Sequence, residues 1–191
     1  TVSSILKKIG LGIEDLLCGS TISLNKEYAQ RLLWDHVEIN PSYTDCSGKH
    51  CGILSVCVLK GYDISGYDLL EHPAQKEIKK IICKVCSVKE DNIVMGIDGC
   101  TVPIFGMSLY NMAFGFCKMA NSGVLEEKYK SAADRVFKAM TTAPEMVAGT
   151  GGFCTELMKN TGGRLKGKLG AEGVYCIGVK DMDLGIAIKI E

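Results

Sequence analysis

Long apolar runs, an excess of one charge and internal repeats are all missing from this chain of 191 residues. A membrane-spanning helix needs about 18 or more consecutive apolar residues, and no stretch approaches that length. Lysine and arginine number 22 together, as do aspartate and glutamate, so the net charge gives no attraction toward nucleic acid or lipid. The glycine-rich stretch 149–152 lacks the Gly-Lys-Ser/Thr ending of a phosphate-binding loop. We therefore expect a soluble globular protein that binds neither nucleic acid nor a membrane.

Cysteine, by contrast, is abundant, with ten residues. Their scatter along the chain does not match the frameworks of small secreted proteins that disulfides hold together. Cys57 and Cys117 fall within apolar helical patterns, a position typical of a free buried thiol. The cysteine usage therefore predicts free thiols in a reducing compartment, and we expect a cytoplasmic protein.

Hydrophobic periodicity predicts an α+β fold, in which helices dominate residues 1–170 and antiparallel strands occupy 173–190. The expected helices span residues 2–9, 24–34, 47–60, 73–85, 108–119 and 125–140. The expected strands span residues 93–97, 173–179 and 185–190. A two-stranded hairpin is marginal in water, so we expect segments outside this chain to complete the C-terminal sheet.

The segment Cys-Ser-Gly-Lys-His at residues 46–50 places a thiol, a hydroxyl, an amine and an imidazole at the predicted start of a helix. The helix dipole favours a thiolate at Cys46. Lys49 lies three residues further on and projects from the same side of the helix. This crowding indicates a metal or catalytic site. The alternative is that Cys46 is a small buried hydrophobe and that Lys49 and His50 belong to a solvated face.

A Cys-x-x-Cys pair, Cys83 and Cys86, ends the predicted helix 73–85. This spacing occurs in redox pairs and as half of a zinc knuckle. No second pair at the spacing of a zinc finger accompanies it, and the surrounding pattern is not β-α-β. We therefore expect Cys86 to face the core.

Five segments along nearly the whole chain resemble, in the same order, motifs of the L-asparaginase II family, the zinc-associated type of asparaginase. They resemble the motifs CSGKH, HPxQ, GIDGCGVP, VAGTG and KxGAEGVY, and they lie at residues 46–50, 71–75, 96–103, 146–151 and 168–175. The resemblance implies a fold similar to serine β-lactamases and glutaminases, with an antiparallel sheet flanked by helices and a helical subdomain. Residues 1–191 would form a single domain of this kind.

The resemblance also implies an activity and a set of site residues. The activity is zinc-assisted hydrolysis of the side-chain amide of L-asparagine to L-aspartate and ammonia, carried out by a cytoplasmic homodimer with Ser-Lys chemistry. The zinc ligands of the family map onto Cys46, Lys49 and Cys100. The residues that line its substrate site map onto His50 and Asp98.

Only some residues of the family's Ser-Lys chemistry have a counterpart in this chain. Lys168 maps onto the lysine of a second Ser-Lys pair in the family. The nucleophile of the family lies in an N-terminal Ser-x-x-Lys motif that a Ser-His-Ser-Gly-Glu segment follows. Ser4 and Lys7 match that motif only formally, because they fall where the family has a later helix, so we expect Ser4 to be an N-cap. We therefore expect a chain truncated at both ends, with little or no asparaginase turnover by itself.

Five positions depart from the family pattern. Thr44 and Asp45 stand where the family has two asparagines, and Asp45 adds negative charge beside Cys46. Thr101 stands where glycine is common. Gly152 and Cys154 replace an arginine and an aspartate, so a contact made by that charged pair is lost here.

Two alternative functions remain open. In one, the chain is a non-catalytic remnant or subunit of the same fold that binds zinc or an amino acid. In the other, the thiols have only redox or structural roles. The sequence also leaves both asparagine and glutamine open as substrates.

Overall fold

The computed structural model describes residues 1–191, which divide into two compact units. The first unit comprises Thr1–Lys79 and Met95–Phe105, and the second comprises Lys80–Val94 and Gly106–Glu191. Every predicted site residue except Lys168 belongs to the first unit. We describe each unit by itself.

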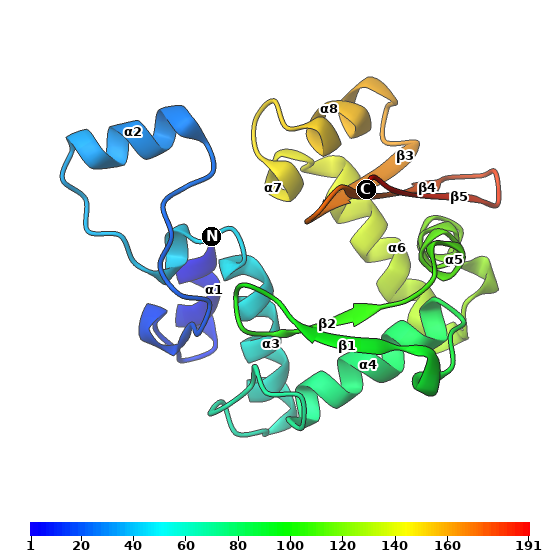
Figure 1. The fold of residues 1–191 in the computed structure, drawn as a ribbon, viewed down its shortest axis with the longest axis horizontal. Helices are drawn as coiled ribbons and strands as arrows, with labels where there is room; N and C mark the ends of the chain where they lie inside the picture. The colour runs from blue at the N-terminus through cyan, green and yellow to red at the C-terminus, as the bar shows by residue number, and fades with distance from the viewer. The chain divides into compact units, whose positions relative to one another are not determined.

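The first unit is mainly helical (Figure 1). Its helices and short 3-10 turns are α1 (Val2–Lys8), η1 (Ile13–Asp15), α2 (Lys26–Trp34), η2 (Pro41–Tyr43), α3 (Ser47–Lys60) and the first part of α4 (Pro73–Val85). The antiparallel hairpin of β1 (Val94–Ile97) and β2 (Pro103–Gly106) contributes its turn and most of both strands.

Helix α3 forms the centre of the first unit and begins and ends where the sequence predicts. Gly61 ends it in the left-handed conformation, with φ of 69°, which only glycine adopts without strain. Its inward face carries Cys51, Leu54 and Cys57 at helical spacing, and all three are buried.

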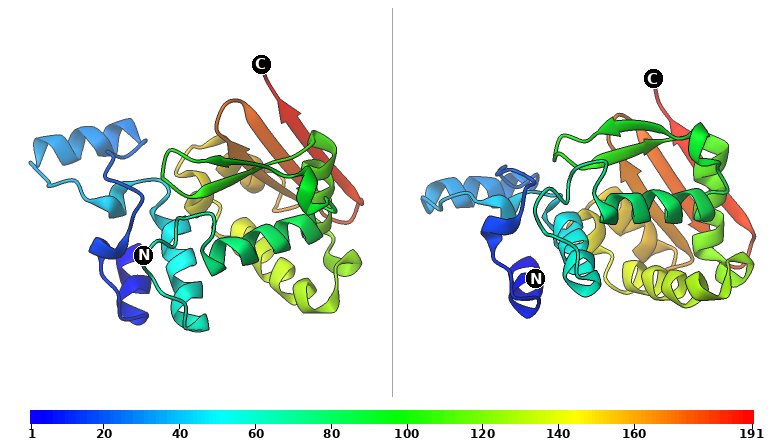
Figure 2. Two further views of the ribbon diagram at one scale, coloured as in Figure 1. Left: turned by 60° about the horizontal axis from the view of Figure 1, so that its bottom comes forward. Right: turned by 90° about the horizontal axis from the view of Figure 1, so that it is seen from below.

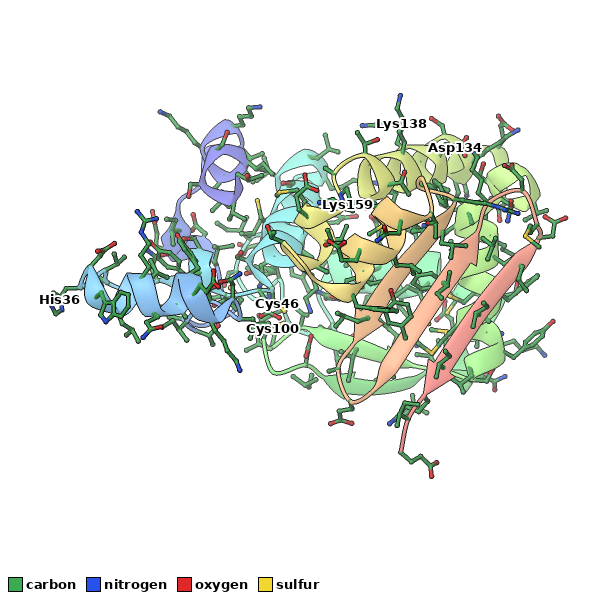
Figure 3. The ribbon with its side chains drawn as sticks, turned by 90° about the horizontal axis from the view of Figure 1, so that it is seen from above. His36, Cys46, Cys100, Asp134, Lys138 and Lys159 are labelled. Atoms are coloured by element: carbon green, nitrogen blue, oxygen red, sulfur yellow. The ribbon has the colours of Figure 1, made fainter.

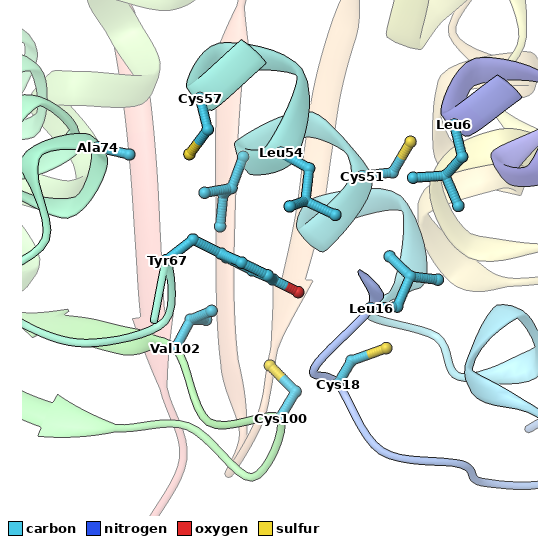
Figure 4. Packing of buried hydrophobic residues seen from close by; sticks show 11 residues of the cluster. Leu6, Leu16, Cys18, Cys51, Leu54, Cys57, Tyr67, Ala74, Cys100 and Val102 are labelled. Carbon is cyan, nitrogen blue, oxygen red and sulfur yellow. The ribbon is translucent and has the colours of Figure 1, made fainter. Parts of the chain in front are cut away.

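The buried cluster of the first unit surrounds the ring of Tyr67, which has no exposed surface. Figure 4 shows this ring between α3 and the hairpin segment that carries Cys100 and Val102. The backbone of Tyr67 is fixed as well, because the side-chain amide of Gln75 in α4 donates a hydrogen bond to its carbonyl, at 2.7 Å. The core therefore packs α3, the Tyr67 loop and the hairpin turn together, and this packing positions the site.

The second unit combines helices with a three-stranded sheet. Its elements are η3 (Glu90–Asn92), α5 (Leu109–Ala120), η4 (Ser122–Val124), α6 (Glu127–Thr142), α7 (Glu145–Ala148), α8 (Phe153–Asn160), β3 (Leu165–Gly170), β4 (Val174–Val179) and β5 (Leu184–Lys189). The strands follow one another in the order β3-β4-β5, all antiparallel, and Figure 2 shows them side by side.

Helix α5 lies very close to the sheet because glycines face it. Gly178 in β4 and Gly185 in β5 are paired across the two strands. A Cβ atom at Gly178 would collide with the carbonyl oxygen of Phe116, and one at Gly185 with that of Ala113. The absence of both side chains therefore lets the α5 backbone rest on the sheet.

The α+β class is confirmed, and so are most of the predicted elements. The structure adds β2, β3, α7 and α8, which the periodicity does not reveal. Strand β3 shows that one further strand of the C-terminal sheet comes from inside the chain, where we expected segments outside it. Ser4 lies inside α1, whose N-cap is Thr1, so the predicted N-cap role of Ser4 is wrong. No helix in the structure combines the length and the apolar character that crossing a bilayer requires.

Candidate metal and active site

The turn of the β1–β2 hairpin holds Asp98 and Cys100 in fixed positions. Two backbone hydrogen bonds close this turn, from Asp98 to Val102 at 2.9 Å and from Thr101 to Asp98 at 3.0 Å. Thr101 adopts a left-handed conformation with φ of 80°, which explains why glycine would suit this position. The Asp98 carboxylate also accepts the N–H of Gly99, at 2.8 Å. The turn therefore presents a carboxylate and a thiol on a rigid loop.

The start of α3 carries the other residues of the site, Cys46 and Lys49. Cys46 is the N-cap of α3, and the ligand atoms of Cys46, Asp98 and Cys100 all lie within 4.8 Å of one another. Figure 3 shows Cys46 and Cys100 beside each other, although 53 residues separate them in the sequence. The structure thus brings together both predicted cysteine ligands and adds Asp98 to the same cluster.

Lys49 points its amine at this cluster, as its position three residues after Cys46 predicts. Its Nζ donates a hydrogen bond to Asp98 Oδ2 at 2.7 Å, which is also an ion pair. Burial works to lower the pKa of Lys49, but the bond to Asp98 and the nearby Cys100 and Cys46 raise it above its ordinary value. The same bond to Lys49 lowers the pKa of Asp98. Without a metal, the pair is therefore an ammonium and a carboxylate.

The predicted thiolate at Cys46 is wrong for this state of the site. The pKa of Cys46 is raised to about 12, chiefly by burial and also by the neighbouring Cys100, which together outweigh the opposite effect of Lys49. Cys46 itself has α-helical backbone angles and makes no side-chain capping bond. The helix N-terminus alone therefore does not ionise this thiol.

His50, predicted to line the substrate site, is completely buried. Its Nδ1 lies 2.6 Å from Tyr67 Oη, and its Nε2 has no hydrogen-bond partner. Burial lowers the pKa of His50 and Lys49 lowers it further, whereas Asp68, the Cys100 backbone and Asp98 act in the opposite direction. The ring is therefore neutral at pH 7 and borders the cluster of Cys46, Asp98 and Cys100.

Lys168, the predicted catalytic lysine, lies in the second unit on β3. Its side chain is exposed, and its Nζ donates only to the carbonyl of the adjacent Leu169, at 2.7 Å. Two residues earlier on the same strand, Lys166 is buried. The sequence carries no signal for the burial of Lys166, because lysine and glycine surround it.

The Cys-x-x-Cys pair is separate from this cluster, because Cys83 and Cys86 belong to the second unit. Cys86 packs against the backbone of Gly115 in α5, so its side chain faces the interior of that unit as predicted. All ten cysteines are free thiols in the structure.

The donor set fits a bound transition metal. Two thiols, a carboxylate and an amine converge on one point, and zinc is bound by such sulfur, oxygen and nitrogen donors. The thiols must lose their protons to bind, so metal binding would be coupled to proton release. The geometry is therefore compatible with a metal site made from α3 and the hairpin turn.

Comparison with protein families gives one result that covers the whole chain. The L-asparaginase II family model matches residues 1–191. The chain therefore belongs to the L-asparaginase II family, whose members are amidohydrolases of the asparaginase type. A search of curated proteins found no match.

Proposed function

We propose that this protein acts in the hydrolysis of the side-chain amide of L-asparagine, with zinc bound by Cys46 and Cys100. The observation that supports it is the convergence of the two thiols with Asp98 and Lys49, in a chain that matches the L-asparaginase II family over its whole length. Zinc, when bound, supplies a Lewis acid that polarises a substrate oxygen.

The third zinc ligand has two candidates. The family resemblance favours Lys49, and the clustering of ligand atoms favours Asp98. A lysine binds a metal only as the neutral amine, whereas Lys49 is an ammonium paired with Asp98 when no metal is bound. Zinc binding through Lys49 therefore releases one proton more than zinc binding through Asp98.

The remaining steps of amide hydrolysis need a nucleophile, a base and a proton donor for ammonia. Lys168 is the proposed base or charge-stabilising group of the Ser-Lys chemistry. Its amine is solvated and bonded only to a neighbouring carbonyl, so reorientation toward a substrate breaks one weak contact. Ser4 has no such support, since it lies exposed in α1 without a hydrogen bond to Lys7.

Zinc content and affinity test the metal site. Protein purified under reducing conditions should contain about one zinc ion per chain. Loss of a residue that only supports a ligand lowers metal affinity by at most about 100-fold. Cys46→Ser removes a ligand itself, so it should lower zinc affinity by more than that. Cys57→Ser is the matched control, because Cys57 lies in the same helix and is buried in the apolar core. Equal affinities in the two variants would contradict the site.

Calorimetry in buffers of different ionisation enthalpy identifies the third ligand by counting released protons. If Asp98 binds zinc, Lys49→Met should leave the number of released protons unchanged. If Lys49 binds zinc, that variant should release one proton fewer and bind more weakly.

Ammonia release from L-asparagine, with L-glutamine in parallel, tests the activity. We expect little ammonia from the chain alone, so the assay is repeated with a segment that carries the Ser-x-x-Lys motif of the family. If the protein then binds zinc and L-aspartate but still releases no ammonia, it is a non-catalytic binding protein of this family. If it also lacks stoichiometric zinc, the thiols have only a redox or structural role. Activity abolished by Ser4→Ala would overturn our interpretation of Ser4.

A further inference from the structure

A chain of hydrogen bonds connects a backbone amide to His50 through Tyr67. The N–H of Leu17 donates to Tyr67 Oη at 2.8 Å, and the same oxygen lies 2.6 Å from His50 Nδ1. Both side chains are completely buried, so bulk water does not reach them. In Figure 4 the hydroxyl of Tyr67 points away from its own loop, toward α3 and the segment carrying Leu16 and Cys18.

The direction of the central bond follows from the number of protons. The Leu17 amide can only donate, so it occupies a lone pair of Tyr67 Oη. If Tyr67 then donates its hydroxyl proton to His50 Nδ1, the hydroxyl is fully bonded and only Nε2–H lacks a partner. If His50 donates from Nδ1 instead, both the hydroxyl proton and the Nε2 lone pair are left buried without partners. Nε2 lacks a partner in both arrangements, but the first leaves fewer unpaired groups because it also satisfies the hydroxyl proton.

We propose that Tyr67 is a positioning residue that fixes His50 as the Nε2–H tautomer, so that His50 acts only as a hydrogen-bond donor. The lone pair of the neutral ring then lies on Nδ1 and is used by Tyr67. A neutral histidine binds a metal or accepts a proton only through its lone pair. His50 is therefore excluded from the metal ligands and from the general bases, although it borders Cys100.

Nε2–H lies near the Cys100 backbone without meeting the geometry of a hydrogen bond. In the proposed function it donates to an acceptor oxygen, and that part of the inference rests on the proposed function. The tautomer itself does not, because the hydrogen bonds of Leu17 and Tyr67 fix it in the absence of any ligand. A measurement of the tautomer therefore separates failure of this inference from failure of the asparaginase proposal.

The chain contains only three histidines, and the other two serve as internal references. His72 Nδ1 accepts the N–H of Ala74 at 3.2 Å, so its proton is on Nε2, which bonds to the carbonyl of Asp63 at 2.9 Å. His72 is thus a fully bonded Nε2–H ring. His36 is exposed, and its ring should exchange between tautomers.

Long-range proton–nitrogen correlation NMR on the full chain, labelled with ¹⁵N-histidine at about pH 8, measures the tautomers directly, because an imidazole of ordinary pKa is neutral there. In the unmodified protein, His50 should show a pyridine-type Nδ1 and a pyrrole-type Nε2, as His72 does. His36 should show two averaged nitrogens. A pyrrole-type Nδ1 at His50 would overturn the proposal without any variant.

Tyr67→Phe removes the hydroxyl that accepts a hydrogen bond from the Leu17 N–H and bonds to His50 Nδ1. The His50 nitrogens should then move toward averaged values or exchange their types, while those of His72 stay unchanged. Tyr62→Phe is the matched control, because the Tyr62 ring contacts His72 edge-on and its hydroxyl bonds to Glu77. That variant should leave the His50 signals as they are. An unchanged Nε2–H tautomer in folded Tyr67→Phe would mean that Tyr67 does not control it.

Addition of zinc to the reduced protein gives a second, independent test. His50 should keep its Nε2 proton when zinc saturates the protein. Loss of that proton on zinc addition would show that His50 is a ligand and would refute the proposal. The metal and activity experiments on Cys46 decide the proposed function separately.

Discussion

Lys166 is a buried amine with no counter-ion, and its replacement by methionine should stabilise the second unit. The residue is only 2% exposed. Its Nζ lies 5.4 Å from the centre of the Phe137 ring and 5.9 Å from that of Phe116. Burial lowers the pKa of Lys166 to about 8. Methionine is similarly long and apolar, so it fills the same space without a charge.

The magnitude follows from that pKa. The fall from 10.5 to about 8 corresponds to about 3 kcal/mol of lost stability at pH 7, at about 1.36 kcal/mol per pKa unit. Cation–π attraction to the two aromatic rings offsets about 1–2 kcal/mol of this lost stability. Lys166→Met should therefore raise the free energy of unfolding by about 1–2 kcal/mol at pH 7.

The pH dependence distinguishes this mechanism from ordinary repacking. The folded pKa of Lys166 lies below its unfolded value, so the cost of charging the amine is complete below about pH 8 and disappears as the pH rises through 10.5. The cation–π attraction disappears with the same charge. The advantage of the methionine variant should therefore shrink to less than about 1 kcal/mol by pH 10.

Urea unfolding at pH 7, 9 and 10, followed by circular dichroism and by hydrogen exchange of the β4 amides, measures this difference. Lys168→Met on the same strand is the control, because Lys168 is exposed and its loss should change stability by less than about 0.5 kcal/mol. A stabilisation that does not change with pH, or a methionine variant less stable than the native protein at pH 7, would refute the reasoning.

Two further substitutions test the packing of each unit. Gly185→Ala should destabilise the second unit by about 1–3 kcal/mol or more, because the new methyl group would collide with a carbonyl oxygen of α5. Gly123→Ala is the control, because a methyl group there would contact no other atom. Thr44→Val should cost the first unit about 1–3 kcal/mol, because the buried Thr44 hydroxyl donates to the Gly19 carbonyl at 2.7 Å. Exposed Thr142→Val is its control. Urea unfolding measures both, and equal effects in variant and control would contradict the packing described.

The sequence predicts helices well here because their signals are local. Helix α3 has an apolar stripe and a terminal glycine, and the structure reproduces its predicted span. Strand β3 has the sequence Leu-Lys-Gly-Lys-Leu-Gly, in which glycine and lysine disfavour a strand. It forms because all six of its residues pair with β4. That pairing is a tertiary effect, which no local pattern shows.

In the candidate site, too, local spacing predicts some features and others depend on the fold. The positions of Cys46 and Lys49 on one helix face follow from spacing, and their meeting with Cys100 follows from the family resemblance. The protonation of Cys46 does not follow from spacing, because it depends on how deeply the hairpin turn buries the thiol. Tyr67 has no sequence signal at all, since it lies in a loop between α3 and α4 and reaches His50 only through the fold.

The charges of the metal-free cluster explain how the proposed zinc site can be balanced without a metal ion. Without Lys49, the charge of the Asp98 carboxylate would be unbalanced beside the thiol of the buried Cys100. Lys49 supplies the missing positive charge, at 2.7 Å, and so takes the place that a metal ion would otherwise fill. When zinc binds, that positive charge becomes redundant, and Lys49 must either withdraw or lose its proton and bind. The salt bridge is therefore expected to compete with zinc, and removing it by Lys49→Met tests whether Lys49 acts as a placeholder or as a ligand.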